Sequence, residues 1–328
     1  MSARPHLAAS AASGRPEAAP GRPTAVLLMA YGSPRSEAEI LPYYTHMRGG
    51  RPPSPQALDE LRRRYSEIGG SSPLQEITAS QAEALAKELR RRGRDWLVRV
   101  GMKHSPPLIE EAILSLAEEG VAAILGLVLA PHYSSLSVGE YQQRAQAAAA
   151  DRPQPPHLTF VSDWHLAPGY LDWLAGQVRS EVAALGGAGA AAPLVIFTAH
   201  SLPARLRELG DPYPDQLGET AAAVADRCQL GRWTTAWQSV ARTGEPWLGP
   251  ELAQVIETEA QAGATRFVVC ACGFTADHLE ILYDLDLEAR RQAERLGVTL
   301  RRTAMPNADP GFIRVLADLV EAALAGGG

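Results

Sequence analysis

Short runs of apolar residues alternate along the first half of the chain with segments of helical spacing. Apolar runs at 25–30, 97–101 and 122–130 predict three strands. The segment 107–119 repeats apolar residues every three or four positions and predicts a helix. The strand segments are apolar almost throughout rather than alternating, which is typical of a parallel sheet covered by helices on both faces.

The second half repeats this pattern. Strands are predicted at 194–199 and 266–272, and helices at 250–261 and 275–296. In both halves a proline precedes a helix, a glycine follows it, and a strand comes next. We therefore predict an α/β fold of two Rossmann-like sub-domains, each a parallel sheet flanked by helices, with the active-site cleft between them.

The domain organisation follows from where these patterns start and stop. We assign 1–23 to a disordered N-terminal tail, 24–161 to a first α/β domain and 162–328 to a second, whose C-terminal helix is a candidate to pack back on the first. The tail has no apolar core of a signal peptide, and its prolines oppose the amphipathic helix of a transit peptide. No apolar run approaches the ~20 residues that a membrane span needs, so we predict no transmembrane segment.

Composition narrows the class of protein. The chain has 328 residues, 46% of them hydrophobic, and a formal net charge of −6. These values exclude a disordered or fibrous chain, and the acidity argues against nucleic-acid binding. Three cysteines are too few for a disulfide framework or a four-thiolate metal cluster. We interpret Cys270 and Cys272 as buried strand thiols and place the protein in the reducing cytoplasm.

Candidate chemistry gathers where the predicted strands end. Nucleotide-binding glycine loops and the Gly-x-Ser-x-Gly elbow are absent from the sequence, which leaves nucleotide binding and serine hydrolysis without support. Tyr31, Lys103, His132 and His200 each follow a predicted strand. Ligands of open α/β sheets bind beyond the carboxyl ends of the strands, so these side chains indicate one cleft.

Each of these features also has a simpler explanation. Glu280, Asp284 and Glu288 stand at i, i+4 and i+8 of a predicted helix, either as a solvated acidic face or as a ladder of oxygen ligands for a cation. His200 is either a hydrogen-bonded structural residue or a catalyst, and Tyr31 either caps the core or belongs to the site. A basic region is either a solvated face or a binding site for carboxylates; it comprises Arg48, Arg51, Arg62, Arg63 and Arg64.

Longer strings of residues point to one family. They include Leu-Met-Ala-Tyr-Gly-Ser-Pro at 28–34, Ala-His-Ser-Leu-Pro at 199–203 and Asp-His-Leu-Glu-Ile-Leu-Tyr-Asp at 277–284, and they occur in order from about residue 24 to the end. In these strings the chain resembles the ferrochelatases, and specifically the coproporphyrin ferrochelatases of Gram-positive type. One departure is Gly49, which stands where the family often has a second arginine after Arg48.

The resemblance implies a role for each candidate residue. His200 and Glu280 would face each other at the metal, with Tyr31 on the opposite face of the macrocycle as an axial ligand to iron. Asp284 and Glu288 would continue outward as an ion path. Contacts to the macrocycle and its propionates would come from Arg48, Arg64, Tyr65, Ser72 and Tyr141, together with Tyr31.

The activity implied is insertion of Fe²⁺ into coproporphyrin III to give coprohaem, a lyase reaction of haem biosynthesis. The substrates would be coproporphyrin III and Fe²⁺, with no organic cofactor, no iron–sulfur cluster and transient contacts to other haem-pathway enzymes. The small, polar segment 67–74 and Tyr31 favour coproporphyrin over protoporphyrin IX. Insertion into protoporphyrin IX, another tetrapyrrole chelatase and a non-catalytic haem or metal binding protein are the alternatives.

Overall fold

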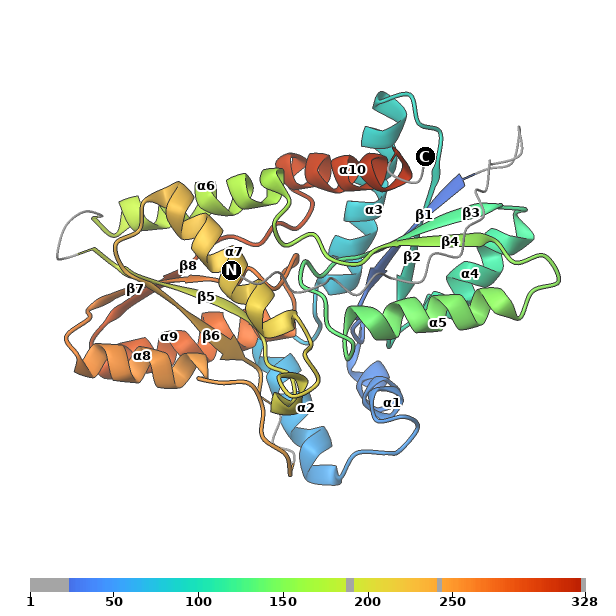
Figure 1. Cartoon of the computed structure of the whole chain (residues 1–328). Coiled ribbons are helices and arrows are strands. Elements are labelled where there is room, and N and C mark those ends of the chain that lie inside the picture. Colours follow the sequence, from blue (N-terminus) through green and yellow to red (C-terminus); the bar gives the residue numbers. More distant parts are fainter. Residues whose placement is uncertain (1–23, 187–191, 241–243, 326–328) are drawn as a thin grey trace.

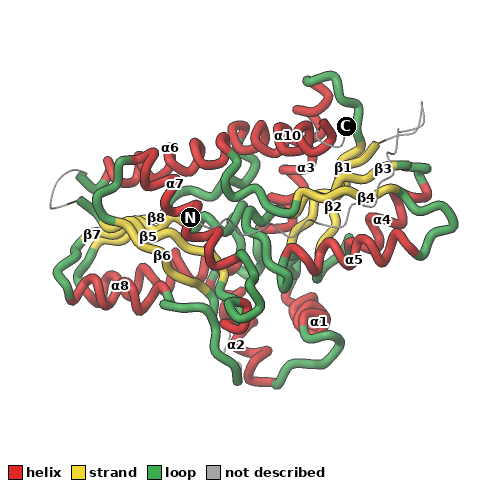
Figure 2. Tube along the Cα trace, viewed as in Figure 1, coloured by secondary structure: helices red, strands yellow, loops and turns green. Residues whose placement is uncertain are grey.

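The protein, seen here as a computed structural model, forms two lobes that lie side by side (Figures 1 and 2). Residues 24–186, 192–240 and 244–325 are described, so the tail predicted at 1–23 lies outside the described residues. Each lobe contains a four-stranded sheet in which all neighbouring strands are parallel. This confirms the predicted α/β fold with two parallel sheets flanked by helices.

The first sheet has the strand order β2-β1-β3-β4. Its strands are β1 (Thr24–Ala30), β2 (Leu97–Met102), β3 (Ala123–Val128) and β4 (His157–Val161). The helices of this half are α1 (Glu37–Met47), α2 (Pro55–Glu67), α3 (Leu74–Arg91), α4 (Ile109–Glu118) and α5 (Val138–Ala150).

The second sheet repeats the plan with the order β6-β5-β7-β8. Its strands are β5 (Leu194–His200), β6 (Trp233–Gln238), β7 (Arg266–Cys270) and β8 (Thr299–Arg302). The helices are α6 (Pro168–Ala184), α7 (Tyr213–Cys228), α8 (Leu252–Gln261), α9 (Arg290–Leu296) and α10 (Pro310–Ala325), with a 3₁₀ turn η1 (Ala204–Leu206) and a π-helix η2 (Glu280–Ala289).

Alternation along the central strands explains why both faces of each sheet are covered. In β1, Val26 and Leu28 join a core that is shared by both lobes, whereas Leu27 and Met29 point into a separate core under α4 and α5. All four side chains are fully buried, so β1 appears in the sequence as an unbroken apolar run. Cys270 and Cys272 are buried free thiols, as predicted.

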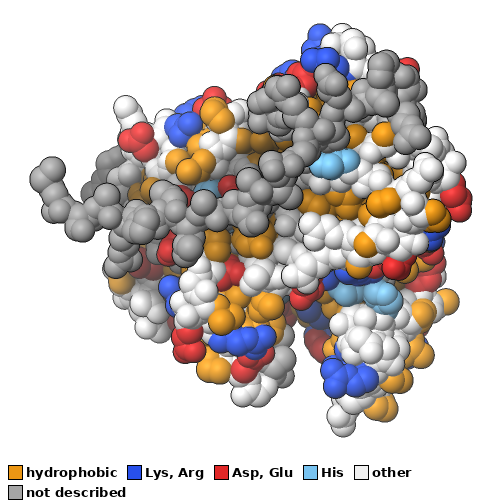
Figure 3. Space-filling model, turned by 45° about the vertical axis from the view of Figure 1, so that its right-hand side comes forward, with side chains coloured by type: hydrophobic (Ala, Val, Ile, Leu, Met, Phe, Trp, Pro, Cys, Tyr) orange, Lys and Arg blue, Asp and Glu red, His pale blue; other side chains and the backbone are white. Residues whose placement is uncertain are grey.

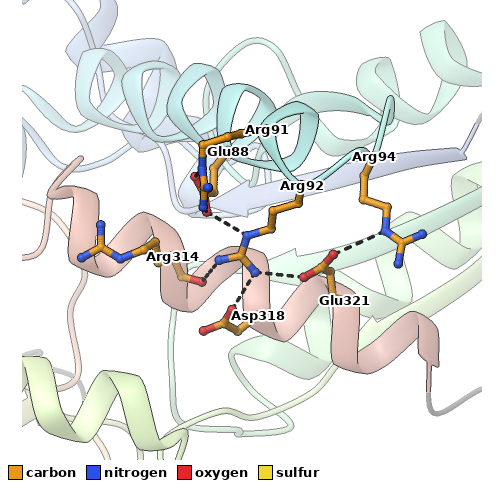
Figure 4. A network of polar contacts seen from close by, with 7 residues as sticks. All are labelled: Glu88, Arg91, Arg92, Arg94, Arg314, Asp318 and Glu321. Carbon is orange, nitrogen blue, oxygen red and sulfur yellow. Dashed lines mark hydrogen bonds and ion pairs between the residues drawn. The ribbon is translucent and has the colours of Figure 1, made fainter.

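The C-terminal helix α10 lies between α6 and α3 and so touches both lobes (Figure 1). Arg92, at the end of α3, binds Asp318 at 2.6 Å and Glu321 at 2.9 Å on α10 (Figure 4). The same guanidinium contacts Glu88 at 2.8 Å on its own helix. The division of the chain at residues 161 and 162 stays a prediction. Among the described residues, no helix is both long and apolar enough to cross a bilayer.

One predicted helix is wrong in its first part. The segment 275–296 was expected to be a continuous helix, but residues 275–278 form a loop and the helix begins as η2. Asn307 holds this loop, because its backbone N–H donates to Thr275 O at 2.9 Å and its side-chain oxygen accepts from Asp277 N at 2.8 Å. These bonds satisfy backbone groups that a helix would otherwise pair internally.

Candidate active site

A cleft of about 1420 Å³ opens between the lobes at the carboxyl ends of the strands. Tyr31 directly follows β1, and His200 is the last residue of β5. In each sheet these strands lie beside the position where the strand order reverses, which is where α/β proteins bind ligands. Figure 3 shows the hollow between the two lobes at the lower edge of the molecule. Of the predicted site residues, all but Arg48 line it: Tyr31, Arg64, Tyr65, Ser72, Tyr141, His200, Glu280, Asp284 and Glu288.

His200 and Glu280 form an ion pair inside the cleft. His200 Nε2 lies 3.4 Å from Glu280 Oε1. The other ring nitrogen, Nδ1, lies 2.5 Å from the carbonyl oxygen of Ser201. A carbonyl oxygen only accepts hydrogen bonds, so Nδ1 carries a proton and Nε2 is the nitrogen presented to Glu280 and the cleft.

The two partners hold each other in their charged forms. Burial lowers the pKa of His200, but the Glu280 carboxylate, together with the Ser201 carbonyl and Asp284, outweighs burial and raises this pKa to about 9. Burial opposes the charge of Glu280 as well, yet His200 and then His278 hold its pKa well below the usual range. At pH 7 the free protein therefore contains an imidazolium–carboxylate pair, whereas a histidine with an unperturbed pKa would be mostly neutral.

Glu280 is the first residue of η2, and the other two acids of the ladder, Asp284 and Glu288, follow it on the same helix. A π-helix closes i→i+5 hydrogen bonds, and such segments occur frequently at functional sites. The second carboxylate oxygen of Glu280 is 3.7 Å from His278 Nε2. Asp284 and Glu288 line the same cleft, so the three acids do share one face. Burial raises the pKa of Asp284 to about 6, against the opposing effect of Arg64.

The wall around Tyr31 comes from the first lobe. The Tyr31 ring meets the His104 ring edge-on at 4.7 Å between centroids. The buried ammonium of Lys103 lies 5.8 Å from the centroid of Tyr31 and 5.2 Å from that of Tyr141, and it pairs with Glu140 at 2.5 Å. Burial, followed by the charges of Glu280 and Glu140, raises the pKa of Tyr31, so the phenol is neutral at pH 7.

Arg48 does not reach the cleft. It is exposed at the C-terminus of α1, with its guanidinium carbon 6.0 Å from the centroid of the Tyr44 ring. Gly49, where a second arginine was expected, has φ +64 and its N–H bonds to His46 O at 3.0 Å. This left-handed conformation ends the helix and suits glycine better than arginine. A contact between Arg48 and the macrocycle stays a prediction.

Some residues and contacts of the cleft were not identified from the sequence. Arg63, a member of the basic region, donates to the Tyr283 hydroxyl at 2.8 Å, and Ser239 donates to Asp284 Oδ2 at 2.5 Å. Ser239 has φ +58, which no sequence signal predicts for a serine. Lys103 lines the cleft, as its position after a predicted strand indicated. Lining residues that the sequence did not single out are Tyr43, Gln238, Ser239, Trp247, His278, Tyr283, Arg291 and Arg295.

Solved structures with a similar fold are chelatases. SirB from Bacillus subtilis with Fe³⁺ superposes with a TM-score of 0.55 and 13% identity, covering 93% of this chain and 96% of that one. CbiX, described as the terminal enzyme of sirohaem biosynthesis in denitrifying bacteria, has a TM-score of 0.54 and 16% identity over 91% of this chain and 99% of its own. This chain thus shares the two-lobed fold of these chelatases.

Sequence relatives narrow this class. A sequence model of the ferrochelatase family matches residues 23–324. Coproporphyrin III ferrochelatases from a Geobacillus species and from Halalkalibacterium halodurans are 40% and 41% identical, over 90% and 92% of this chain and 96% and 97% of theirs. A ferrochelatase from Thermus thermophilus is 42% identical over 91% of this chain and 98% of its own. The chain belongs to the ferrochelatase family.

Proposed function

We propose that this protein inserts ferrous iron into coproporphyrin III, giving coprohaem in haem biosynthesis. The observation that carries the proposal is the His200–Glu280 pair in a cleft large enough for a tetrapyrrole. Ligand sites for small molecules range from roughly 300 to 1,000 Å³, and this cleft, at about 1420 Å³, exceeds that range. The relatives named as coproporphyrin III ferrochelatases support the choice of reaction.

Metal insertion requires two pyrrole N–H protons to leave while Fe²⁺ loses its water. A charged His200 cannot bind a cation or accept a proton, so it must first lose the proton on Nε2. Metal binding displaces protons from its ligands, and Fe²⁺ arriving beside Glu280 would lower the pKa of His200. Imidazole and carboxylate both suit ferrous iron. Glu280, Asp284 and Glu288 would then accept and relay protons toward solvent along η2.

Tyr31 would act from the opposite wall of the cleft. Its hydroxyl belongs to a neutral phenol in the free protein, which can coordinate iron weakly through oxygen after insertion. The aromatic wall that Tyr31 shares with Tyr65 and Tyr141 would press on a face of the ring. Binding energy from the ring edge could then support the distortion that exposes the pyrrole nitrogens.

Basic residues around the cleft favour a substrate with many carboxylates. Arg63, Arg64, Arg291 and Arg295 all line it, as does the buried Lys103. Guanidinium groups bind carboxylates bidentately, and coproporphyrin carries four propionates where protoporphyrin IX carries two. Contacts from Arg64, Tyr65, Ser72 and Tyr141 to the macrocycle are part of the proposal.

The test is an anaerobic Fe²⁺ insertion assay run in parallel with coproporphyrin III and protoporphyrin IX. We expect turnover with the first to exceed turnover with the second by at least tenfold in kcat/KM. Equal rates with the two porphyrins would contradict a preference for coproporphyrin III. If both porphyrins bind but neither receives iron, the result would favour a non-catalytic binding protein. A cytoplasmic location, supported by three free thiols, and transient haem-pathway partners are further parts of this proposal.

A further inference from the structure

An ion pair between Arg64 and Asp284 connects the two lobes across the cleft. Arg64 lies on α2 and Asp284 on η2, 220 residues further along the chain, and both line the cleft. The Arg64 guanidinium also lies over the Tyr283 ring, with 4.5 Å from its central carbon to the ring centroid. Figure 1 shows α2 below the two lobes.

Arg64 uses only one of the two neighbouring N–H groups with which an arginine can bind a carboxylate bidentately. Its Nη2 donates to Asp284 Oδ1, but the Nε–H beside it is buried and has no hydrogen-bond partner. Two other arginines that bind a partly buried carboxylate use both of these N–H groups. Arg144 binds Glu110 through Nε at 2.6 Å and Nη2 at 2.7 Å, and Arg302 binds Asp286 through the same two atoms at 2.8 and 2.7 Å. A buried donor without a partner costs free energy, so Arg64 is poised for a better-fitting carboxylate.

Asp284 does not depend on Arg64 alone for its position. Ser239 donates to its other carboxylate oxygen, Oδ2, at 2.5 Å. Ser239 adopts φ +58, a conformation that is unfavourable for a residue other than glycine and that is often found at functional sites. This second hydrogen bond would keep Asp284 in place on η2 if Arg64 turned away.

We propose that a carboxylate of the bound porphyrin replaces Asp284 on Arg64, so that substrate binding releases Asp284 into the acidic ladder. The inference rests on the proposed function, because it takes the substrate to be a porphyrin with several carboxylates. One ion pair is exchanged for another. The incoming carboxylate accepts hydrogen bonds from both Nε and Nη2 of Arg64, and Asp284 Oδ1 is left facing the cleft.

The exchange would make the availability of Asp284 for metal insertion depend on whether the porphyrin is already bound. In the free protein the charge of Asp284 is compensated by Arg64. Once the porphyrin has taken Arg64, Asp284 Oδ1 faces the cleft, one helical turn from Glu280 on the same cleft face. Asp284 would therefore be open to the incoming Fe²⁺ and its displaced protons only when the ring is already bound.

Binding of coproporphyrin III without metal, followed by absorbance titration, tests the exchange. Asp284→Asn removes the competitor for Arg64, so we expect about fivefold tighter binding, the upper range for a partly exposed ion pair. Glu288→Gln is the matched control, since it removes the same charge from the same cleft without touching Arg64, and we expect unchanged binding. In an Arg64→Ala background, Asp284→Asn should no longer tighten binding.

Two results would overturn the exchange. One is tightening by Glu288→Gln, or by Asp284→Asn in the Arg64→Ala background, because both would show a general effect of charge. The other is wild-type binding that Asp284→Asn leaves unchanged, which defeats the exchange but leaves the proposed function standing. Failure of the wild-type protein to bind coproporphyrin III at all would defeat both.

Discussion

His200 Nε2 and Glu280 Oε1 lie 3.4 Å apart although they belong to different segments of the second lobe. His200 ends β5, and Glu280 begins η2 shortly after the neighbouring strand β7. The carboxyl ends of parallel neighbours lie at the same edge of a sheet, so the pairing of β5 with β7 brings imidazole and carboxylate together. The pair is therefore a direct product of the sheet topology.

The first prediction concerns His200→Ala. We expect iron insertion to fall by at least about 100-fold, the lower end of what a positioned acid or base contributes. Coproporphyrin III should still bind, because the basic residues and aromatic wall of the cleft are unchanged. Anaerobic insertion rates and a separate binding titration measure the two effects. His157→Ala, in an exposed position on β4, is the control, and retained activity in His200→Ala would refute the role of His200.

The second prediction compares two acids on η2. Glu280→Gln should slow insertion at least about tenfold more than Asp286→Asn, since Glu280 contacts His200 whereas Asp286 pairs with Arg302 at 2.7 Å. The comparison uses kcat for Fe²⁺ insertion under saturating porphyrin. Equal effects of the two substitutions would mean that η2 has no functional face.

The third prediction follows the protonation of His200. With its pKa raised to about 9, chiefly by Glu280, His200 is charged at pH 7, and Glu280→Gln should lower this pKa, since only the Ser201 carbonyl and Asp284 then oppose the effect of burial. NMR titration of the histidine rings, assigned with His200→Ala, measures this pKa. A wild-type His200 that titrates near pH 6.5 would contradict the prediction.

The same pair makes stability depend on pH. The raised pKa of His200 gives a contribution that is fully present below about pH 6.5 and is lost as the pH rises through about 9. The lowered pKa of Glu280 gives one that is present above about pH 4.3 and is lost as the pH falls. Thermal unfolding should therefore show a loss of stability between about pH 6.5 and pH 9 that is smaller in Glu280→Gln.

The fourth prediction concerns Gly273, which lies behind His200. A Cβ at this position would lie 2.5 Å from Ala199 Cβ and 2.7 Å from Ala199 Cα. Gly273→Ala must therefore displace the end of β5, and we expect a loss of about 1–3 kcal/mol in the free energy of unfolding together with reduced insertion. Urea denaturation measures the first effect. Gly231→Ala, where a Cβ would meet nothing within 4 Å, should stay within about 0.5 kcal/mol of the wild type.

The fifth prediction is the absence of an iron–sulfur cluster from the purified protein. Of the three cysteines, Cys270 and Cys272 are buried in the second lobe, and Cys228 on α7 bonds to Ala175 O at 3.4 Å. A cluster normally takes four thiolate ligands. Anaerobically prepared protein should show no charge-transfer absorbance in the visible region, and acid-labile sulfide in the preparation would contradict this.

The sequence predicts the four central strands and the edge strand β2, but it misses the edge strands β4, β6 and β8. β1 and β5 are buried on both faces, so their apolar runs are unmistakable. β4, β6 and β8 lie at the edges of the sheets and carry partly exposed polar residues, so they lack such runs. The positions of Tyr31 and His200 at strand ends were predictable for the same reason.

Contacts between distant segments were not predictable from the residues. Arg64 appeared as one member of a basic region and Asp284 as one member of an acidic face, and nothing in their spacing indicates that they pair. The loop at 275–278 likewise depends on hydrogen bonds to Asn307, about thirty residues away. Neither periodicity nor local propensity contains such long-range information.

The repeated strand order has a consequence for any flat molecule held between the lobes. Tyr31 and His200 occupy equivalent places in the two halves, each at the end of the first strand of its sheet. A protein with two identical halves would offer the same side chain to both sides of a disc-shaped guest. The two halves of this chain instead place a phenol at one strand end and an imidazole at the other, so a guest held between them would have a chemically defined top and bottom.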